Sequence, residues 1–352
     1  MTKVMTRWSL VGLALLLSLT VVGMSATTAA SRQETTTVKV GYLHTPAVDV
    51  HLWLGMQKGY YEKHGIILEP QQFNSGPPLA QALAGGSIDV AIMGAVISNF
   101  PSRGQGKVFL INDVERNTAQ LWVAADSGIN AVTDLSGKSV ATTQGTTAHV
   151  FLQTALEANQ VDPSSVEIVN FDMPGAVNAF ISGAVPAVVL WSPFELQVQE
   201  QRPDAKLVDS ANTYYPESAI VGGWVANNDF YENEKETLAA ITRGWLEANT
   251  DLTSDPAGSL QIVHEAAYSE NMSLEQLTYI FEQEEVFTNQ EWADRYADGT
   301  VAEWIGRVEQ VFVDIGAFPD FVEPSEFFDP QIYLDTFAAM ATSTPEAATP
   351  AP

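Results

Sequence analysis

The chain of 352 residues contains no cysteine. This absence excludes disulfides, thiolate zinc sites, iron–sulfur clusters, thiol nucleophiles and lipid attachment through sulfur. Basic residues are also scarce, because 16 Lys and Arg stand against 43 Asp and Glu, a formal net charge of −27. Such a surface repels nucleic-acid phosphates and anionic lipid headgroups. We therefore expect no nucleic-acid partner, and the acidity of the surface does not identify a ligand.

Long apolar runs are limited to one, near the N-terminus. Two basic residues precede an apolar run over 8–24, and small residues follow over 25–30. This order is typical of a secretory signal peptide that is cleaved after Ala26 or Ala30, and a retained membrane anchor is the alternative. We expect residues 1–30 to be a signal peptide. The mature protein is then periplasmic, at the cell surface or extracellular, and it is not a lipoprotein.

The last dozen residues, 341–352, are Ala, Thr, Ser and Pro with one Glu. This composition cannot build a core, so we expect a disordered tail. At about 150 residues per domain, the length that remains predicts two domains or one two-lobed unit.

Short β-rich runs alternate with helical stretches in two successive units, which predicts an α/β fold with parallel strands and right-handed crossovers. The first unit has predicted strands at 38–42, 66–73 and 88–93 and predicted helices at 47–64 and 77–84. The second unit has predicted strands at 139–143, 166–171 and 187–191 and predicted helices at 146–158 and 175–182.

Two extended runs, 121–125 and 219–226, look like crossings between the lobes, and 232–340 is mostly helical by its periodicity. From these runs we expect three segments: lobe 1 over 31–125, lobe 2 over 126–221, and a return to lobe 1 with C-terminal helices over 222–340.

Turns rich in glycine and hydroxyl side chains follow strands of both units. In open α/β sheets ligands bind at the carboxyl ends of the strands, and such turns expose backbone N–H groups that suit an anion. Ordinary helix capping and turn chemistry is the alternative explanation. The candidate ligand-binding residues are His44 and Thr45, Ser75 and Gly76, Gly94 and Ala95, and Thr146, Thr147 and His149.

Trp191 ends a buried strand, where it either forms an apolar wall of a ligand site or packs in the core. His44, Asp49 and His51 match no recognised metal-ligand spacing, so we expect no metal. The sequence contains no Gly-x-Ser-x-Gly, no phosphate-binding loop and no His-Glu-x-x-His. We therefore expect no catalytic constellation and no cofactor.

Five stretches, in this order and spacing, match a known family of proteins. They are 73–76, 86–90, 134–141, 146–149 and the Trp-x-Pro at 191–193. In this combination the chain resembles the solute-binding proteins of ATP-driven importers for taurine, alkanesulfonates and nitrate, a group that includes binders of thiamine pyrimidine precursors. The resemblance implies a type II periplasmic-binding-protein fold. Each lobe is then a mainly parallel sheet flanked by helices, with two hinge crossings.

The resemblance also implies a site. In the sulfonate binders turn amides and hydroxyls hold the ligand near an aromatic ring, and the matching positions here are Ser75, Gly76, Gly94, Ala95, Thr146, Thr147, His149 and Trp191. Taurine binders place a carboxylate for the ligand amine just before the position of Trp224, where this chain has Gly222 and Gly223. Glu217, in the preceding loop, is the candidate replacement, and Gly222 is also a candidate ligand-binding residue.

The expected function is an extracytoplasmic substrate-binding component of an ABC importer, a monomer that delivers its ligand to a permease and ATPase complex. The expected ligand is a small anionic or zwitterionic solute, taurine or another aliphatic sulfonate. Nitrate, a thiamine pyrimidine precursor, and a module that feeds a receptor are alternatives. The pyrimidine synthases related to this group use a cysteine-rich iron motif, which this chain lacks, so we do not expect an enzyme.

Overall fold

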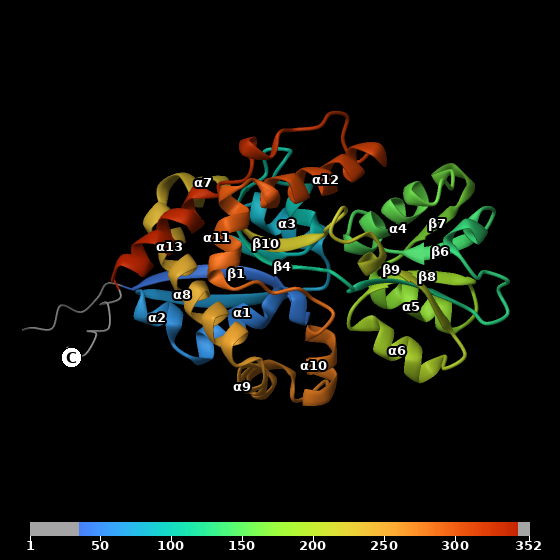
Figure 1. Cartoon of the computed structure of the whole chain (residues 1–352), viewed down its shortest axis with the longest axis horizontal. Helices are drawn as coiled ribbons and strands as arrows, with labels where there is room; N and C mark the ends of the chain where they lie inside the picture. The colour runs from blue at the N-terminus through green and yellow to red at the C-terminus, as the bar shows by residue number, and fades with distance from the viewer. Residues whose placement is uncertain (1–34, 344–352) are drawn as a thin grey trace, which may run out of the picture. The chain divides into compact units, whose positions relative to one another are not determined.

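The computed structural model of the chain describes residues 35–343 (Figure 1). The predicted signal peptide and the predicted tail from residue 344 onward lie outside the described residues. The tail prediction is wrong for its first three residues, because helix α13 (Gln331–Ser343) extends through them. Its Ala-rich end favours a helix, and α13 packs on α8 (Lys235–Ser254). Within the described part of the chain, no helix is long and apolar enough to cross a bilayer.

The first sheet has the strand order β2-β1-β3-β10-β4. β1 pairs in parallel with β2 and β3, whereas β10 is antiparallel to both β3 and β4. Four strands therefore run in one direction, and their carboxyl ends meet at one edge. The strands are β1 (Thr36–Leu43), β2 (Ile66–Phe73), β3 (Val90–Met93), β4 (Lys107–Val114) and β10 (Val221–Ala226).

The second sheet repeats this plan with the order β7-β6-β8-β5-β9. β6 pairs in parallel with β7 and β8, and β5 is the antiparallel strand between β8 and β9. The predicted two-lobed α/β fold with mainly parallel sheets is confirmed. The strands are β5 (Ala119–Val123), β6 (Ser139–Thr142), β7 (Glu167–Asn170), β8 (Ala187–Trp191) and β9 (Lys206–Ser210).

The two runs interpreted as crossings are strands, which corrects that interpretation. β5 belongs to the second sheet and β10 to the first, each between two other strands. No α-helix separates β4 from β5 or β9 from β10, so neither run stands in the strand-helix-strand alternation from which the other strands are predicted. The chain crosses between the sheets just before each strand, over 115–118 and 211–220. The two crossings contact each other, because the Glu115 N–H donates to the Ile220 carbonyl at 2.8 Å.

The helices of the two units fall where the periodicity predicts them, with one difference. The predicted helix 47–64 is two helices, because Gly59 adopts φ 68° and interrupts it. This left-handed conformation suits glycine. The helices are α1 (Pro46–Gln57), α2 (Tyr60–Lys63), α3 (Gly76–Ala84), α4 (Thr147–Ala158), α5 (Met173–Ile181) and α6 (Phe194–Gln201), and the short 3₁₀ turns are η1 (Ala95–Ser98), η2 (Val132–Leu135), η3 (Pro163–Ser165) and η4 (Ala211–Tyr214).

The C-terminal third is mostly helical, as predicted, and it contributes to both cores. α8 and α13 pack with the first sheet, whereas Val308 and Phe312 of α12 pack with the core of the second sheet. The remaining elements are α7 (Asn228–Asn233), α9 (Pro256–Val263), the π-helical turn η5 (His264–Tyr268), α10 (Leu274–Phe281), α11 (Asn289–Ala297), α12 (Thr300–Asp314) and η6 (Pro324–Glu326).

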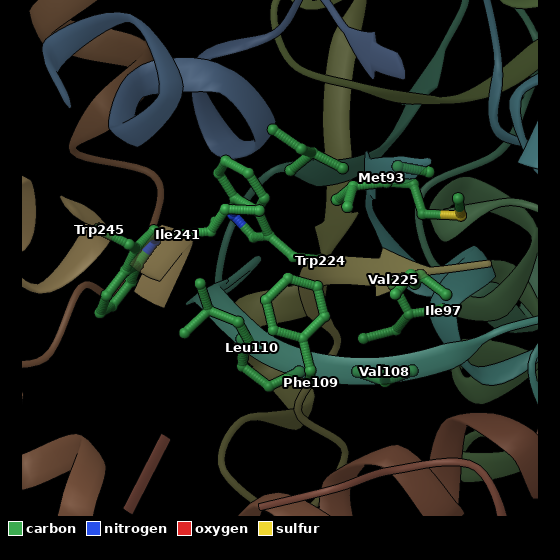
Figure 2. Packing of buried hydrophobic residues seen from close by; sticks show 14 of the residues in the cluster. Met93, Ile97, Val108, Phe109, Leu110, Trp224, Val225, Ile241 and Trp245 are labelled. Carbon is green, nitrogen blue, oxygen red and sulfur yellow. The ribbon is translucent and has the colours of Figure 1, made fainter. Parts of the chain in front are cut away.

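The core of the first lobe joins β3, β4 and β10 to helix α8. Figure 2 shows Trp224 of β10 and Trp245 of α8 close to Leu110 and Phe109 of β4. All four side chains are fully buried. Because burial of apolar area is the dominant favourable term in folding, this layer holds the sheet edge that carries the site in place.

Two glycines let Tyr61 pack between α1 and α8. A Cβ on Gly244 would lie 2.5 Å from Tyr61 Cδ1, and one on Gly55 would lie 2.5 Å from Tyr61 Cε2. Because the ring is confined on both sides, it cannot move away from an added methyl group.

Gly244→Ala should therefore lower the free energy of unfolding by about 1–3 kcal/mol, in spite of the better helix propensity of alanine. Urea unfolding of the variant measures this effect. Gly306→Ala in α12 is the control, because its Cβ would meet its nearest neighbour only at 3.2 Å. Equal losses in the two variants would contradict the steric explanation.

Candidate functional site

A cavity of about 30 Å³ lies between the carboxyl edge of the first sheet and the start of α4. The turns after β1 and β3 form one side of it, and the turn before α4 and the end of β8 form the other. It is therefore built by both lobes. Its lining residues are Leu43, Thr45, Val48, Gly76, Gly94, Val96, Glu115, Thr146, Thr147 and Trp191.

Half of the predicted ligand-binding residues line this cavity: Thr45, Gly76, Gly94, Thr146, Thr147 and Trp191. Four more lie beside it. His44 and Ser75 each precede a lining residue, and the backbone N–H of Ala95 donates to Thr147 Oγ1 at 3.2 Å. Gly222 lies next to Gly94, since a Cβ on Gly222 would be 3.5 Å from the Gly94 Cα.

Two predicted residues are placed elsewhere. His149 lines a separate open hollow of about 620 Å³ between α4 and the end of α12, and its Nδ1 accepts from the Gly145 N–H at 3.1 Å. Burial lowers the pKa of His149 to about 4, so it is neutral. Glu217 is exposed and does not line the cavity. Neither side chain lines the cavity in this structure, so the expected ligand contacts of His149 and Glu217 stay predictions.

A carboxylate that the sequence analysis did not single out occupies the centre of the site. Glu115, 5% exposed, accepts from the Thr147 hydroxyl at 3.1 Å and from the Thr118 hydroxyl at 3.2 Å. The Ala95 N–H also reaches this carboxylate. Burial raises the pKa of Glu115 to about 7, although these donors oppose the rise. The amide and hydroxyl donors expected to hold a ligand oxyanion are thus bound to the chain's own carboxyl group.

The other threonine hydroxyl is also committed. Thr146 Oγ1 donates to the Thr143 carbonyl at 2.7 Å, inside the turn that leads into α4. It does not cap the helix by its side chain. Thr146 therefore shapes the turn, while Thr147 carries the polar contact across the cavity.

Two further buried carboxyl groups lie near Glu115. Asp113, at the end of β4, is 1% exposed, and Glu284, in the loop after α10, is 8% exposed. Burial and the neighbouring Glu115 raise the pKa of Asp113. Burial, then Asp113, Glu115 and the more distant Asp49, raise the pKa of Glu284. The site thus holds a group of three buried carboxyls that repel one another when charged.

Glycine at position 94 permits this arrangement. A Cβ there would overlap Glu115 Oε1 and lie 2.7 Å from Thr147 Oγ1. Any side chain at this position would separate the cavity from the Glu115 carboxylate.

The residues considered for a metal bind other partners. His44 Nδ1 lies 2.7 Å from Asp49, which also accepts from Trp53 and from Tyr268. His51 instead bonds Asn249 at 2.9 Å. Over the described residues, no group of three or more acidic or histidine side chains is arranged to hold a metal ion.

Residues 50–259, more than half of the chain, match the family model described as NMT1/THI5 like. The chain belongs to the NMT1/THI5-like family. This membership agrees with the predicted resemblance, since the matched segment contains the cavity-lining turns from Gly76 to Trp191.

Two curated relatives are similar over different lengths. A putative binding protein from Brucella abortus (strain 2308) is 24% identical over 291 residues, which cover 83% of this chain and 89% of the relative. The taurine-binding periplasmic protein of Escherichia coli (strain K12) is 26% identical over 200 residues, 56% of this chain and 61% of that protein.

Among solved structures, the periplasmic nitrate-binding protein from Synechocystis PCC 6803 aligns with a TM-score of 0.69 at 16% identity, over 89% of this chain and 90% of that one. A desulfurization enzyme aligns with a TM-score of 0.64 at 13% identity, over 86% and 99%. The fold of this chain is therefore the periplasmic-binding-protein fold. Because a binding protein and an enzyme share this fold, only the residues of the site can distinguish binding from catalysis.

Proposed function

We propose that this protein is the extracytoplasmic substrate-binding component of an ABC importer, and that it captures a small solute in the cavity between its lobes. The observation that carries the proposal is the cavity itself, which turns from both sheets line at the carboxyl ends of parallel strands. The names of the relatives, a binding protein and a taurine-binding periplasmic protein, support it.

The two crossings between the lobes are the hinge at which we expect the cavity to open and close around a ligand. They lie side by side at the Glu115–Ile220 hydrogen bond, next to the cavity. A volume of about 30 Å³ holds a water molecule or a single polar group, so a larger solute enters only when the walls move apart. Rotation at the crossings opens the walls without disturbing either sheet, and the ligand then replaces the direct contact between Thr147 and Ala95.

The partners follow from this role. A membrane permease with its ATPase receives the solute, and the binding protein works as a monomer outside the cytoplasm after its signal peptide is removed. A receptor that reads the same closure is the alternative partner, and the permease is favoured because periplasmic binding proteins are among the relatives.

Binding is favoured over catalysis by the surroundings of the hydroxyl groups. A nucleophilic hydroxyl needs a base within hydrogen-bond reach. The Thr146 hydroxyl bonds a backbone carbonyl, and His149 lines the separate open hollow. Glu115 does contact Thr147, but a threonine hydroxyl held between a carboxylate and the Ala95 N–H is positioned as a link between lobes.

The solutes implied by the resemblance differ in charge. Nitrate and simple alkanesulfonates are only negative, whereas taurine also carries an ammonium group and the pyrimidine precursors carry an amino group. A free oxyanion would have to lie beside Glu115 and compete with it for the Thr147 and Ala95 donors. A ligand with a nitrogen donor meets no such conflict.

The test is a thermal-shift screen of sulfonates, nitrate, amines and aminopyrimidines, followed by calorimetry on each compound that raises the melting temperature. We expect one compound to bind with 1:1 stoichiometry. Gly94→Val should reduce its affinity at least 100-fold, because the side chain fills the cavity and displaces Glu115.

Ala184→Val, on an exposed turn outside the cavity, is the matched control and should bind normally. The proposal fails if no compound binds, or if Gly94→Val retains full affinity for the compound that does.

A further inference from the structure

The carboxyl groups at the cavity have no basic partner in the described part of the chain. The nearest cation in sequence, Arg116, forms its ion pair with Glu285 at 2.8 Å. Glu115 has only hydroxyl and amide donors, and the ion pairs formed by described residues include neither Asp113 nor Glu284. The site is therefore acidic and uncompensated.

Asp113 is the least satisfied of the three. Both of its carboxylate oxygens are buried without a hydrogen-bond partner, and so is Oε1 of Glu284. Asp113 Oδ1 lies 3.0 Å from the point where a Cβ of Gly222 would be, and the Gly94 Cα lies 3.5 Å from that same point. The carboxylate is thus directed at the pair of glycines that borders the cavity.

This arrangement is costly without a ligand. A buried polar group that lacks a partner costs about 1–3 kcal/mol, and a buried charge without a countercharge costs more. Natural proteins keep such groups where function requires them. A cationic ligand provides the countercharge that Asp113 and Glu115 both lack and the hydrogen-bond donors that Asp113 lacks, whereas an anion adds a further negative charge to the same space.

An aromatic wall completes the environment of a cation. Trp191 lines the cavity, and its ring packs in a T-shaped arrangement with Phe194, with ring centroids 6.0 Å apart. The face of an indole attracts ammonium and guanidinium groups, more strongly when the site is desolvated.

We propose that the cavity binds the positively charged nitrogen group, an ammonium or an amidinium, of a small organic solute, with Glu115 and Asp113 as its acceptors. This inference rests on the proposed solute-binding function and specifies the class of solute. It assigns Asp113 a role although Asp113 does not itself line the cavity, because its carboxylate lies beside Gly222, which borders the cavity-lining Gly94.

The experiment uses probes that match in shape and differ in charge. Guanidinium and nitrate are both planar and trigonal; ethylammonium and ethanesulfonate share an ethyl chain; butane-1,4-diammonium and butane-1,4-disulfonate share a butyl chain. Calorimetry of the purified protein at pH 8 with each probe, up to 10 mM, should show binding of the cation in at least one pair and of no anion.

Glu115→Gln and Asp113→Asn should each weaken the bound cation at least tenfold. The exposed Glu69→Gln and Asp320→Asn are the matched controls and should bind within twofold of the unmodified protein. Circular dichroism of all four variants checks that they fold.

The possible failures separate the two proposals. If an anion binds and Gly94→Val abolishes its binding, the solute-binding function stands and the proposal of a cationic ligand is wrong. The proposal of a cationic ligand is also wrong if none of the cations binds. It is equally wrong if Asp113→Asn and Glu115→Gln bind a cation with the same affinity as the unmodified protein. The solute-binding function fails only if the wider screen also finds no ligand that depends on Gly94.

Discussion

Replacing Asn112 with alanine should lower the free energy of unfolding by at least about 3 kcal/mol. The Asn112 side chain is fully buried in β4, one residue before Asp113. Its Oδ1 accepts from the indole N–H of Trp224 at 2.7 Å and of Trp245 at 2.9 Å, and its Nδ2 donates to the Val48 carbonyl at 2.7 Å. Alanine leaves two donors and one acceptor buried without partners, at about 1–3 kcal/mol each.

This loss is large compared with the total stability of a protein, about 5–15 kcal/mol. Urea unfolding followed by tryptophan fluorescence measures it. Asn212→Ala, at an exposed position of η4, is the control and should change the stability by less than about 0.5 kcal/mol. A loss below 1 kcal/mol for Asn112→Ala would contradict the hydrogen-bond network, as would a loss equal to that of the control.

The network also connects the sheet edge at the site to three neighbouring elements. Asn112 connects β4 to α1 through Val48, to β10 through Trp224 and to α8 through Trp245 (Figure 2 shows both indoles). Val48 lines the cavity, and Asp113 follows Asn112 directly. The polar bonds in the core thus hold in place the elements that carry the proposed ligand acceptors.

The order of strands and helices could be predicted from local periodicity where strands alternate with helices. The sequences of β1, β2, β6 and β8 each precede a helix, and all four strands were predicted near their observed positions. β4 and β9 were not predicted. Each is followed directly by a crossing and an antiparallel strand, so no helix separates it from the next strand.

The turns of the site could be predicted for a related reason. Gly76, Gly94 and Thr147 follow predicted parallel strands, and the carboxyl ends of such strands meet at one edge. Glu115 was missed because its strand was missed. The apolar run 108–111 followed by Asn, Asp and Glu is the local signal that would have placed carboxylates at this edge.

Glu284 had no such signal. It reaches the site because Val114 and Glu285 form an isolated bridge between β4 and the loop after α10. Residues so distant in the sequence meet only in the folded chain, and one acidic residue in a helical and acidic region does not stand out. The sequence therefore predicted the donors of the site and missed the acceptors, and this difference changes the expected charge of the ligand.

The acidic site should make the stability of the free protein depend on pH. The usual pKa of a glutamate is 4.5, and burial raises that of Glu115 to about 7 in the folded protein. The folded protein then retains a proton that the unfolded chain releases. The stabilisation from this proton is fully present below pH 4.5 and is lost as the pH rises to about 7, by up to about 3 kcal/mol at 1.36 kcal/mol per pKa unit.

Glu115→Gln should remove this loss, because a glutamine amide resembles the protonated carboxyl group and does not ionise. We expect the variant to match the unmodified protein in stability near pH 4.5, to exceed it increasingly up to about pH 7, and to keep that advantage at pH 8. Asp113 and Glu284 face Glu115 and also titrate, so the quantity to measure is the difference between the two proteins in urea unfolding at each pH.

Glu69→Gln, exposed on β2, is the control and should give a difference that does not vary with pH. A Glu115→Gln difference that is equally flat would show that this carboxyl group titrates normally. If the difference rises as expected, the free protein bears a cost at neutral pH that a bound cation would offset, because a positive charge favours the ionised form of Glu115. The gain in stability of Glu115→Gln at pH 8 and its loss of cation binding then have one cause, the uncompensated charge of a buried carboxylate.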